Sequence, residues 1–288
     1  MFATPKLETS ISTGVRPLTL RNRVASPING VASLDSPAAA RALYVKERQK
    51  WMRARKAESD YAAQLRQVAR QVGVLVKGFA PSGTLEQFAV LRDALLKYAD
   101  LLYPWAKSVA QRMLEEVSRK DESAWKEHGQ KIGRSLWNEI TLAPTGAVMR
   151  QRMDEQVDLI TSLPREAAER VHKLSIRAVS TSMRAEEIQA DILRTGEVTK
   201  SRAETIARTE VSRASTELLM ARAKFVGSTH YEWLTARDAD VRPLHRRLDG
   251  KIFAWDDPPV TGEGGERSLP GGIYNCRCVA LPIIPDKV

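Results

Sequence analysis

The sequence predicts a mainly α-helical protein with a small α+β region at its C-terminal end. Apolar residues recur at helical spacing through most of residues 37–226, and short alternating segments begin only after Gly227. Aromatic residues make up 6% of the chain, which favours helix over sheet. We therefore expect three parts, which are an extended or disordered arm over residues 1–36, a helical domain over residues 37–182, and a C-terminal α+β domain over residues 183–288.

The predicted arm is rich in Ser, Thr, Pro and Gly. Pro5, Pro17 and Pro27 forbid a continuous helix there, so the arm is expected either to stay disordered or to become ordered against a partner. Ser36 followed by Pro37 then marks a helix start, because Ser is a favoured N-cap and Pro a favoured first helical residue.

The helical domain is divided by prolines and glycines. Pro104 is expected to kink the helix that contains it, because proline removes one backbone donor and clashes with the preceding turn. The expected helices cover residues 37–77, 84–117 with a kink at Pro104, a segment that contains Trp125 and Trp137 and ends at Pro144, and residues 147–163, 165–181 and 184–193, the last closed by Gly196.

The C-terminal domain is expected to combine one long helix with a β-hairpin or small sheet. The helix covers residues 199–226, buries a seam of small residues and ends at Gly227. Leu248-Asp-Gly-Lys251 predicts a tight hairpin turn, because Asp and Gly both tolerate positive φ. The expected strands cover residues 229–235, 252–255 and 274–284, with a loop over residues 257–272.

Chemistry is concentrated near the C-terminus, where Cys276 and Cys278 are the only cysteines. Two residues apart on a strand, they share one face, and His245 lies about thirty residues upstream. Thiolates and imidazole are ligands that zinc prefers, so we predict a structural zinc site. The alternatives are two small core residues or a disulfide between them. The candidates for a fourth ligand are Asp240, Asp238 and, behind them, His230.

The chain is basic, with 45 Lys and Arg residues against 35 acidic ones and a formal net charge of +10. Such an excess favours contact with a polyanion such as DNA, RNA or an acidic protein surface, although basic residues also solvate long helices. One basic segment is a candidate for DNA contact or, alternatively, a solvated helix face; it contains Lys46, Arg48, Lys50, Arg53, Arg55 and Lys56.

Nothing in the sequence predicts a membrane segment. No run of eighteen apolar residues occurs, and the N-terminus lacks the basic-then-apolar order of a signal peptide. Two cysteines in a chain of this length do not form a disulfide framework, so we expect a reducing compartment that leaves the thiols free for metal.

Four sequence blocks between Met183 and Pro285 together resemble the Mu F-like domain of minor head, or head morphogenesis, proteins from tailed bacteriophages. No single block is specific, but their order and separation are. The blocks are Ser201–Ala214; Trp233–Asp238 followed by Val241–His245; Leu248–Phe253; and Asn275–Cys278 before Pro282.

The resemblance implies a minor head protein that acts in head morphogenesis, is made in the host cytoplasm and resides in the virion head. It also implies partners, which are the portal protein, the major capsid or scaffold protein, and packaged DNA. In such a structural protein, charged residues near the site are expected to form an ion-pair latch between the long helix and the hairpin. The latch candidates are Arg208, Glu210, Asp238 and Arg242.

Two other functions stay open at this stage. The latch residues could instead surround a catalytic centre, in which a metal-dependent nuclease or other hydrolase would use His245 and Asp240. A plain DNA-binding module is the second alternative. The zinc-deaminase pattern, the HExxH metalloprotease motif and a phosphate-binding glycine loop are all absent from the sequence, so we expect no enzyme activity and assign no catalytic residue.

Overall fold

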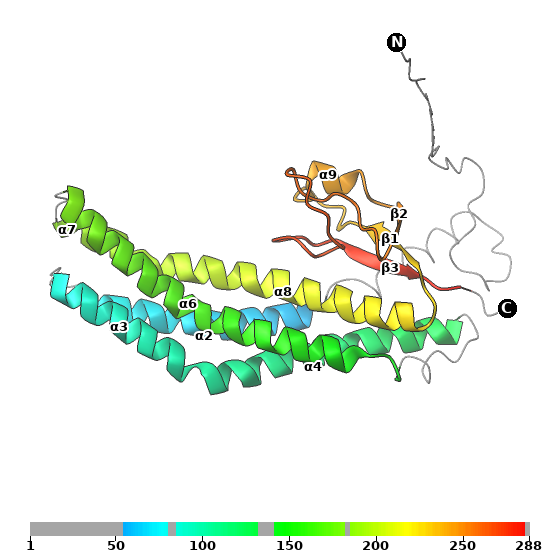
Figure 1. Ribbon diagram of the computed structural model, residues 1–288, viewed down its shortest axis with the longest axis horizontal. Helices are drawn as coiled ribbons and strands as arrows, with labels where there is room; N and C mark the ends of the chain where they lie inside the picture. The colour runs from blue at the N-terminus through cyan, green and yellow to red at the C-terminus, as the bar shows by residue number, and fades with distance from the viewer. Residues whose placement is uncertain (1–53, 80–84, 132–140, 182–184, 286–288) are drawn as a thin grey trace, which may run out of the picture.

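A long helical bundle carries a small β-sheet on one side (Figure 1). The structure, a computed structural model, describes residues 54–79, 85–131, 141–181 and 185–285. The predicted arm and four of the basic candidates (Lys46, Arg48, Lys50 and Arg53) lie outside these ranges. Within them the prediction of a mainly α fold with a small C-terminal sheet is confirmed.

The secondary structure follows the chain in a simple order. The helices are α2 (Arg55–Phe79), α3 (Leu85–Leu101), α4 (Tyr103–Lys131), α6 (Thr145–Thr181), α7 (Ala185–Leu193), α8 (Thr195–Phe225) and the short α9 (Pro243–Arg246). The strands are β1 (His230–Leu234), β2 (Ile252–Ala254) and β3 (Val279–Ile283), in the spatial order β2-β1-β3 with both pairs antiparallel. No described helix is both long and apolar enough to cross a membrane.

The two prolines expected to disturb helices, Pro104 and Pro164, behave differently. Near Pro104, where a kink in one helix was predicted, the structure instead has two helices, since α3 and α4 are separated at Leu102. The division predicted at Pro164 is wrong, because α6 continues through this residue. Leu163 and Ala167 beside it are buried, and this packing compensates for the single backbone hydrogen bond that proline removes.

Two further boundaries differ from the sequence prediction. Trp125 lies in α4 and not in a separate helix, because no glycine or proline interrupts the chain between Trp105 and Trp125. Gly196 does not close the preceding helix but lies in the first turn of α8. There it faces Gly73 of α2 so closely that a Cβ atom on Gly196 would lie 3.2 Å from the Cα of Gly73.

Helix α8 belongs to two hydrophobic cores. The part from Ala203 to Leu218 packs with α2, α4 and α6, where residues such as Ala207 are fully buried. The last turns of α8 pack instead with the end of α4 and the sheet, where Ala223 meets the cluster around Trp233. The predicted domain boundary between residues 182 and 183 stays a prediction. Helix α8, which falls in the predicted C-terminal domain, packs in the core of the helical bundle as well as against the sheet.

The C-terminal sheet is connected differently from the predicted hairpin. Gly227 ends α8 with a φ of +88°, as expected for a left-handed residue at this position. The tight turn is present, since the Lys251 amide donates to the Leu248 carbonyl at 3.0 Å and Gly250 has a φ of +77°. However, this turn joins α9 to β2, because residues 235–251 separate the paired strands β1 and β2.

We predict that Gly196→Ala destabilises the protein by about 1 kcal/mol, since the added methyl group meets backbone rather than a movable side chain. Gly78→Ala in α2 is the matched control. Nothing lies within 4 Å of a Cβ atom at position 78. The free energy of unfolding of Gly78→Ala should therefore rise by up to about 1 kcal/mol, because alanine favours helix more than glycine does. Denaturant unfolding measures both, and an equal effect of the two substitutions would contradict the close packing of α2 against α8.

Candidate metal centre

His245 is carried by the short helix α9 and points into the protein. Arg242 precedes the helix in an extended conformation, and Pro243 occupies its first position, where the missing N–H has no helical partner to lose. The imidazole is buried, with 2% of the residue exposed. His245 thus lies on a short helix just before the turn at Leu248–Lys251, and its inward orientation suits a ligand.

Cys276 and Cys278 lie in a loop rather than on the last strand, which begins only at Val279. Asn275, just before them, has a φ of +57°, a left-handed conformation that Asn adopts more readily than most residues. The Cys276 amide then donates to the Ile273 carbonyl at 3.1 Å. The two cysteines therefore share one orientation because of a turn, and not because of the alternation of a strand.

The three side chains converge on one point. The Nδ1 atom of His245 lies 3.6 Å from the Sγ atom of Cys276 and 3.5 Å from that of Cys278. All three residues are buried, and their ligand atoms lie within 4.8 Å of one another. A tetrahedral zinc ion, with Zn–S of about 2.3 Å and Zn–N of about 2.0–2.1 Å, separates N and S ligand atoms by about 3.5–3.6 Å. The group therefore has the geometry to hold a metal ion.

The surroundings of His245 fix which ring nitrogen faces the sulfurs. Its Nε2 lies 3.1 Å from the Thr261 carbonyl oxygen, which accepts the Nε2–H hydrogen bond. Nδ1 is then left with its lone pair directed at the cysteines, as in metal sites where the second ring nitrogen donates to a carbonyl. Trp233 packs edge-on against the imidazole, with ring centroids 5.5 Å apart, and limits its rotation.

The two thiols influence each other electrostatically. A hydrogen bond from Cys278 holds the pKa of the Cys276 thiol well below its usual range, against the opposing effect of burial. The same contact with Cys276 raises the pKa of Cys278. A bound cation would favour the thiolate form of both cysteines, because cysteine binds a metal as the thiolate.

The candidates for a fourth ligand lie elsewhere. Asp238 and Asp240 both contact the guanidinium group of Arg277, at 2.6 Å and 3.1 Å, and the Asp240 side chain is 82% exposed. His230 is exposed and its Nδ1 lies beside the Thr229 hydroxyl. Among the described residues the converging group contains three side chains, so Asp240 is not placed with the other predicted ligands.

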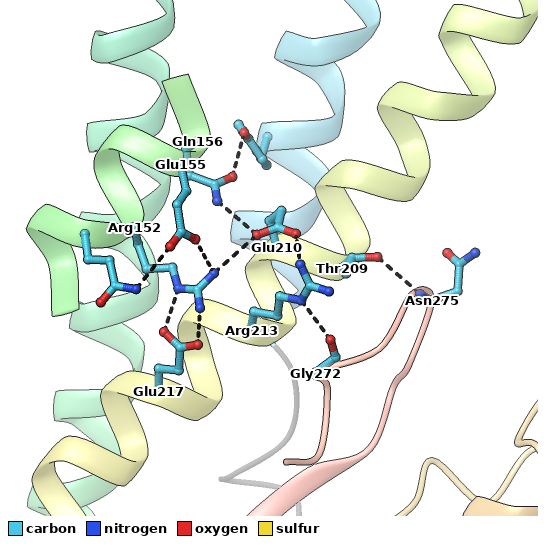
Figure 2. Close-up of polar contacts among 11 residues, drawn as sticks. Arg152, Glu155, Gln156, Thr209, Glu210, Arg213, Glu217, Gly272 and Asn275 are labelled. Carbon is cyan, nitrogen blue, oxygen red and sulfur yellow. Dashed lines mark hydrogen bonds and ion pairs between the residues drawn. The ribbon is translucent and has the colours of Figure 1, made fainter. Parts of the chain in front are cut away.

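The four predicted latch residues do not pair with one another. Arg208 donates to the Asn275 side-chain oxygen at 3.2 Å, and Arg242 donates to the Tyr274 carbonyl at 2.8 Å. Asp238 binds Arg277, so three of the four candidates hold the cysteine loop, which we define as residues 270–278. Glu210 is instead buried among the helices of the bundle (Figure 2).

The cysteine loop packs on helix α8 and is hydrogen-bonded to its side chains. The Thr209 hydroxyl accepts the Asn275 amide at 3.2 Å, and the Thr216 hydroxyl donates to the Pro270 carbonyl at 2.7 Å. Gly271 has a φ of +81° and passes so close to α8 that a Cβ atom would lie 3.1 Å from the Ser212 carbonyl oxygen. The loop is thus held by side chains of α8 along its whole approach to Cys276.

Several residues of the site were not predicted from sequence. Thr261 contributes a backbone carbonyl, and no side-chain pattern indicates such a role. Arg213 donates to the Gly272 carbonyl at 2.8 Å, a contact that its place on a helix does not indicate. Asn275 and Arg277 carried a recognisable signal, because Asn favours left-handed turns and the arginine lies between the two cysteines.

The described basic candidates lie at the start of α2. Lys56 contacts Asp60 at 2.9 Å and lies 3.7 Å from Glu116, so nearby carboxylates offset its charge. Arg55 is exposed and lines a groove between α2, α8 and the cysteine loop, beside Arg208 and Arg277. The structure therefore brings Arg55 near the C-terminal region, while its contact with DNA stays a prediction.

Comparison with known proteins relates the C-terminal region, with its candidate metal centre, to one protein family. Residues 169–281 match the family described as "Phage Mu protein F like protein". This region, which includes all three converging side chains, is similar to the phage Mu F-like family, and the resemblance stated from the sequence blocks is confirmed.

Two individual relatives extend the comparison. The chain is 21% identical over 252 residues to the protein named "Minor head protein GP7" of Bacillus phage SPP1, and the match covers 79% of this chain and 81% of that protein. It is 31% identical over 131 residues to an uncharacterized protein of Haemophilus influenzae; this match covers 46% of this chain and 28% of that longer relative. No solved structure gives a significant match.

We predict that Gly271→Ala destabilises the protein more than Gly265→Ala does. Both glycines have a φ between +80° and +90°, so alanine should cost about 1–2 kcal/mol at either position. A Cβ atom has nothing within 4 Å at Gly265, whereas at Gly271 it meets Ser212, which should add about 1–3 kcal/mol. If thermal unfolding shows that the two substitutions destabilise the protein equally, this would contradict the close packing of the cysteine loop against α8.

Proposed function

We propose that this protein is a minor head protein of a tailed phage or prophage, that it acts in head assembly and that it resides in the virion head. The observation that carries this proposal is the similarity to the SPP1 minor head protein, which extends over about four fifths of both chains. The family match supports it independently through the C-terminal region. An elongated helical bundle with a small stabilised sheet also suits a component that docks onto a larger assembly (Figure 1).

The proposed partners are the portal protein, the major capsid or scaffold protein, and packaged DNA. A formal net charge of +10 supports a position close to a polyanion, because an excess of basic residues raises the local concentration of nucleic acid. The basic segment from Lys46 to Lys56 is the part of the sequence that best suits contact with phosphates, since six of its eleven residues are Lys or Arg.

The proposed metal is zinc, in a structural role. Two thiolates and one imidazole form a ligand set that zinc prefers, and the ligand separations suit a tetrahedral ion. His245, Cys276 and Cys278 come from α9 and from the loop before β3, so an ion bound to all three would join two segments that flank a small sheet. The burial of the three ligands supports this role over hydrolysis, which requires a coordination position open to substrate.

The assembly proposal predicts that purified particles of the encoding phage or prophage contain this chain. Its copy number should lie well below that of the major capsid protein. Quantitative mass spectrometry with isotope-labelled peptides from both proteins measures the ratio. Complete absence of the chain from heads that assemble normally would overturn the proposal.

The metal proposal predicts about one zinc ion per chain in wild-type protein and none in the Cys276→Ser, Cys278→Ser double variant. At a free zinc concentration of 100 times Kd, binding should stabilise the wild type by about 2.7 kcal/mol. Elemental analysis and thermal unfolding with and without a chelator measure these effects. His230→Ala is the control, because this histidine is exposed and outside the converging group. Zinc-free wild type, or a double variant that retains zinc, would refute the site.

A further inference from the structure

Arg213 of α8 connects a buried polar network in the bundle to the cysteine loop (Figure 2). Its Nη1 donates to the Glu210 Oε1 at 2.8 Å, while its Nε donates to the Gly272 carbonyl at 2.8 Å. One guanidinium group therefore contacts the bundle and the loop at the same time. A lysine has a single terminal nitrogen and could not reproduce this two-sided contact.

On the bundle side, the position of Arg213 is fixed by a buried carboxylate. Glu210 is 3% exposed, and its second oxygen accepts a hydrogen bond from Gln156 at 3.1 Å. The Gln156 amide in turn accepts the Tyr61 hydroxyl at 2.9 Å, and Arg152 lies 3.7 Å from Glu210. Because moving Arg213 would leave this buried charge without its closest cation, the network holds the guanidinium in one place.

On the loop side, Arg213 contacts Tyr274, which is linked to both segments that carry the metal ligands. Its guanidinium lies 5.6 Å from the centroid of the Tyr274 ring, in the range of a cation–π contact. The Tyr274 carbonyl accepts a hydrogen bond from Arg242, the residue that directly precedes the α9 helix of His245. Tyr274 itself lies two residues before Cys276, so its position affects the imidazole and the sulfurs together.

We propose that Arg213 is a positioning residue for the metal centre and sets its metal affinity through Gly272 and Tyr274. The reason is pre-organisation: a loop that is already held in place loses less conformational entropy when its cysteines bind an ion. Residues outside the ligand set that orient ligands typically change metal affinity by roughly 10–100-fold. This inference rests on the proposed zinc site, and it adds a dependence of that site on the helical bundle.

The experiment compares zinc affinity in the full-length wild type, Arg213→Met and Arg202→Met. Arg202 is the matched control, because it lies on the same helix, pairs with Glu166 on α6, and has a side chain 32% exposed against 29% for Arg213. Competition with a chromophoric chelator, well below the unfolding temperature, measures the affinity. We expect a loss of roughly 10-fold or more for Arg213→Met and less than about 2-fold for Arg202→Met.

A second variant and a second readout separate positioning from general stability. Arg213→Lys keeps a positive charge beside Glu210, so it should fold if Arg213→Met does not, yet it should still bind zinc more weakly than the wild type. Cobalt(II) bound in place of zinc should show altered visible absorption in both Arg213 variants and an unchanged spectrum in Arg202→Met, because this absorption depends on ligand geometry.

The outcomes distinguish this inference from the proposal on which it rests. If the wild type binds neither zinc nor cobalt, the metal proposal fails and the inference falls with it. If the wild type binds zinc and both arginine positions give equal affinities and unchanged cobalt spectra, the metal proposal stands and the inference is overturned. A selective loss of affinity at Arg213 supports both.

Discussion

Helix α8 has to be buried on two opposite sides at once, and the arrangement of the other elements depends on this constraint. The bundle helices cover one side through residues such as Ala207, and the sheet and cysteine loop cover the other through Ser212 and Ala223. Small and polar residues are therefore required where a larger side chain would separate the layers. Buried polar side chains such as Glu210 and Arg222 find partners on neighbouring helices, which fixes the rotation of α8 about its axis.

Much of this architecture could be predicted from sequence, because α8 and the bundle helices carry long periodic patterns. The end of α8 at Gly227 and the turn at Gly250 were also predictable, since glycine there permits positive φ. The continuity of α6 through Pro164 was not, because burial of the surrounding side chains outweighs the local preference of proline. The helix α9, which carries His245, was not predictable either, since four residues are too few to give a periodic pattern.

The candidate site was predictable in its chemistry but not in its geometry. His245, Cys276 and Cys278 were identified by residue type, and they converge as expected. The reasoning that placed the cysteines on a strand was wrong, because the left-handed Asn275 and its contacts to α8 orient them instead. Such tertiary contacts join residues more than sixty positions apart, and a single sequence contains no local pattern that reveals them.

The two-sided packing of α8 also limits how this protein can change in length. One residue inserted within the helix would rotate every later side chain by about 100° about the axis. Residues that face the bundle, such as Leu218, would then turn towards the sheet, and the threonine and arginine contacts to the cysteine loop would be lost together. Insertions and deletions among related chains should therefore be confined to segments outside α8.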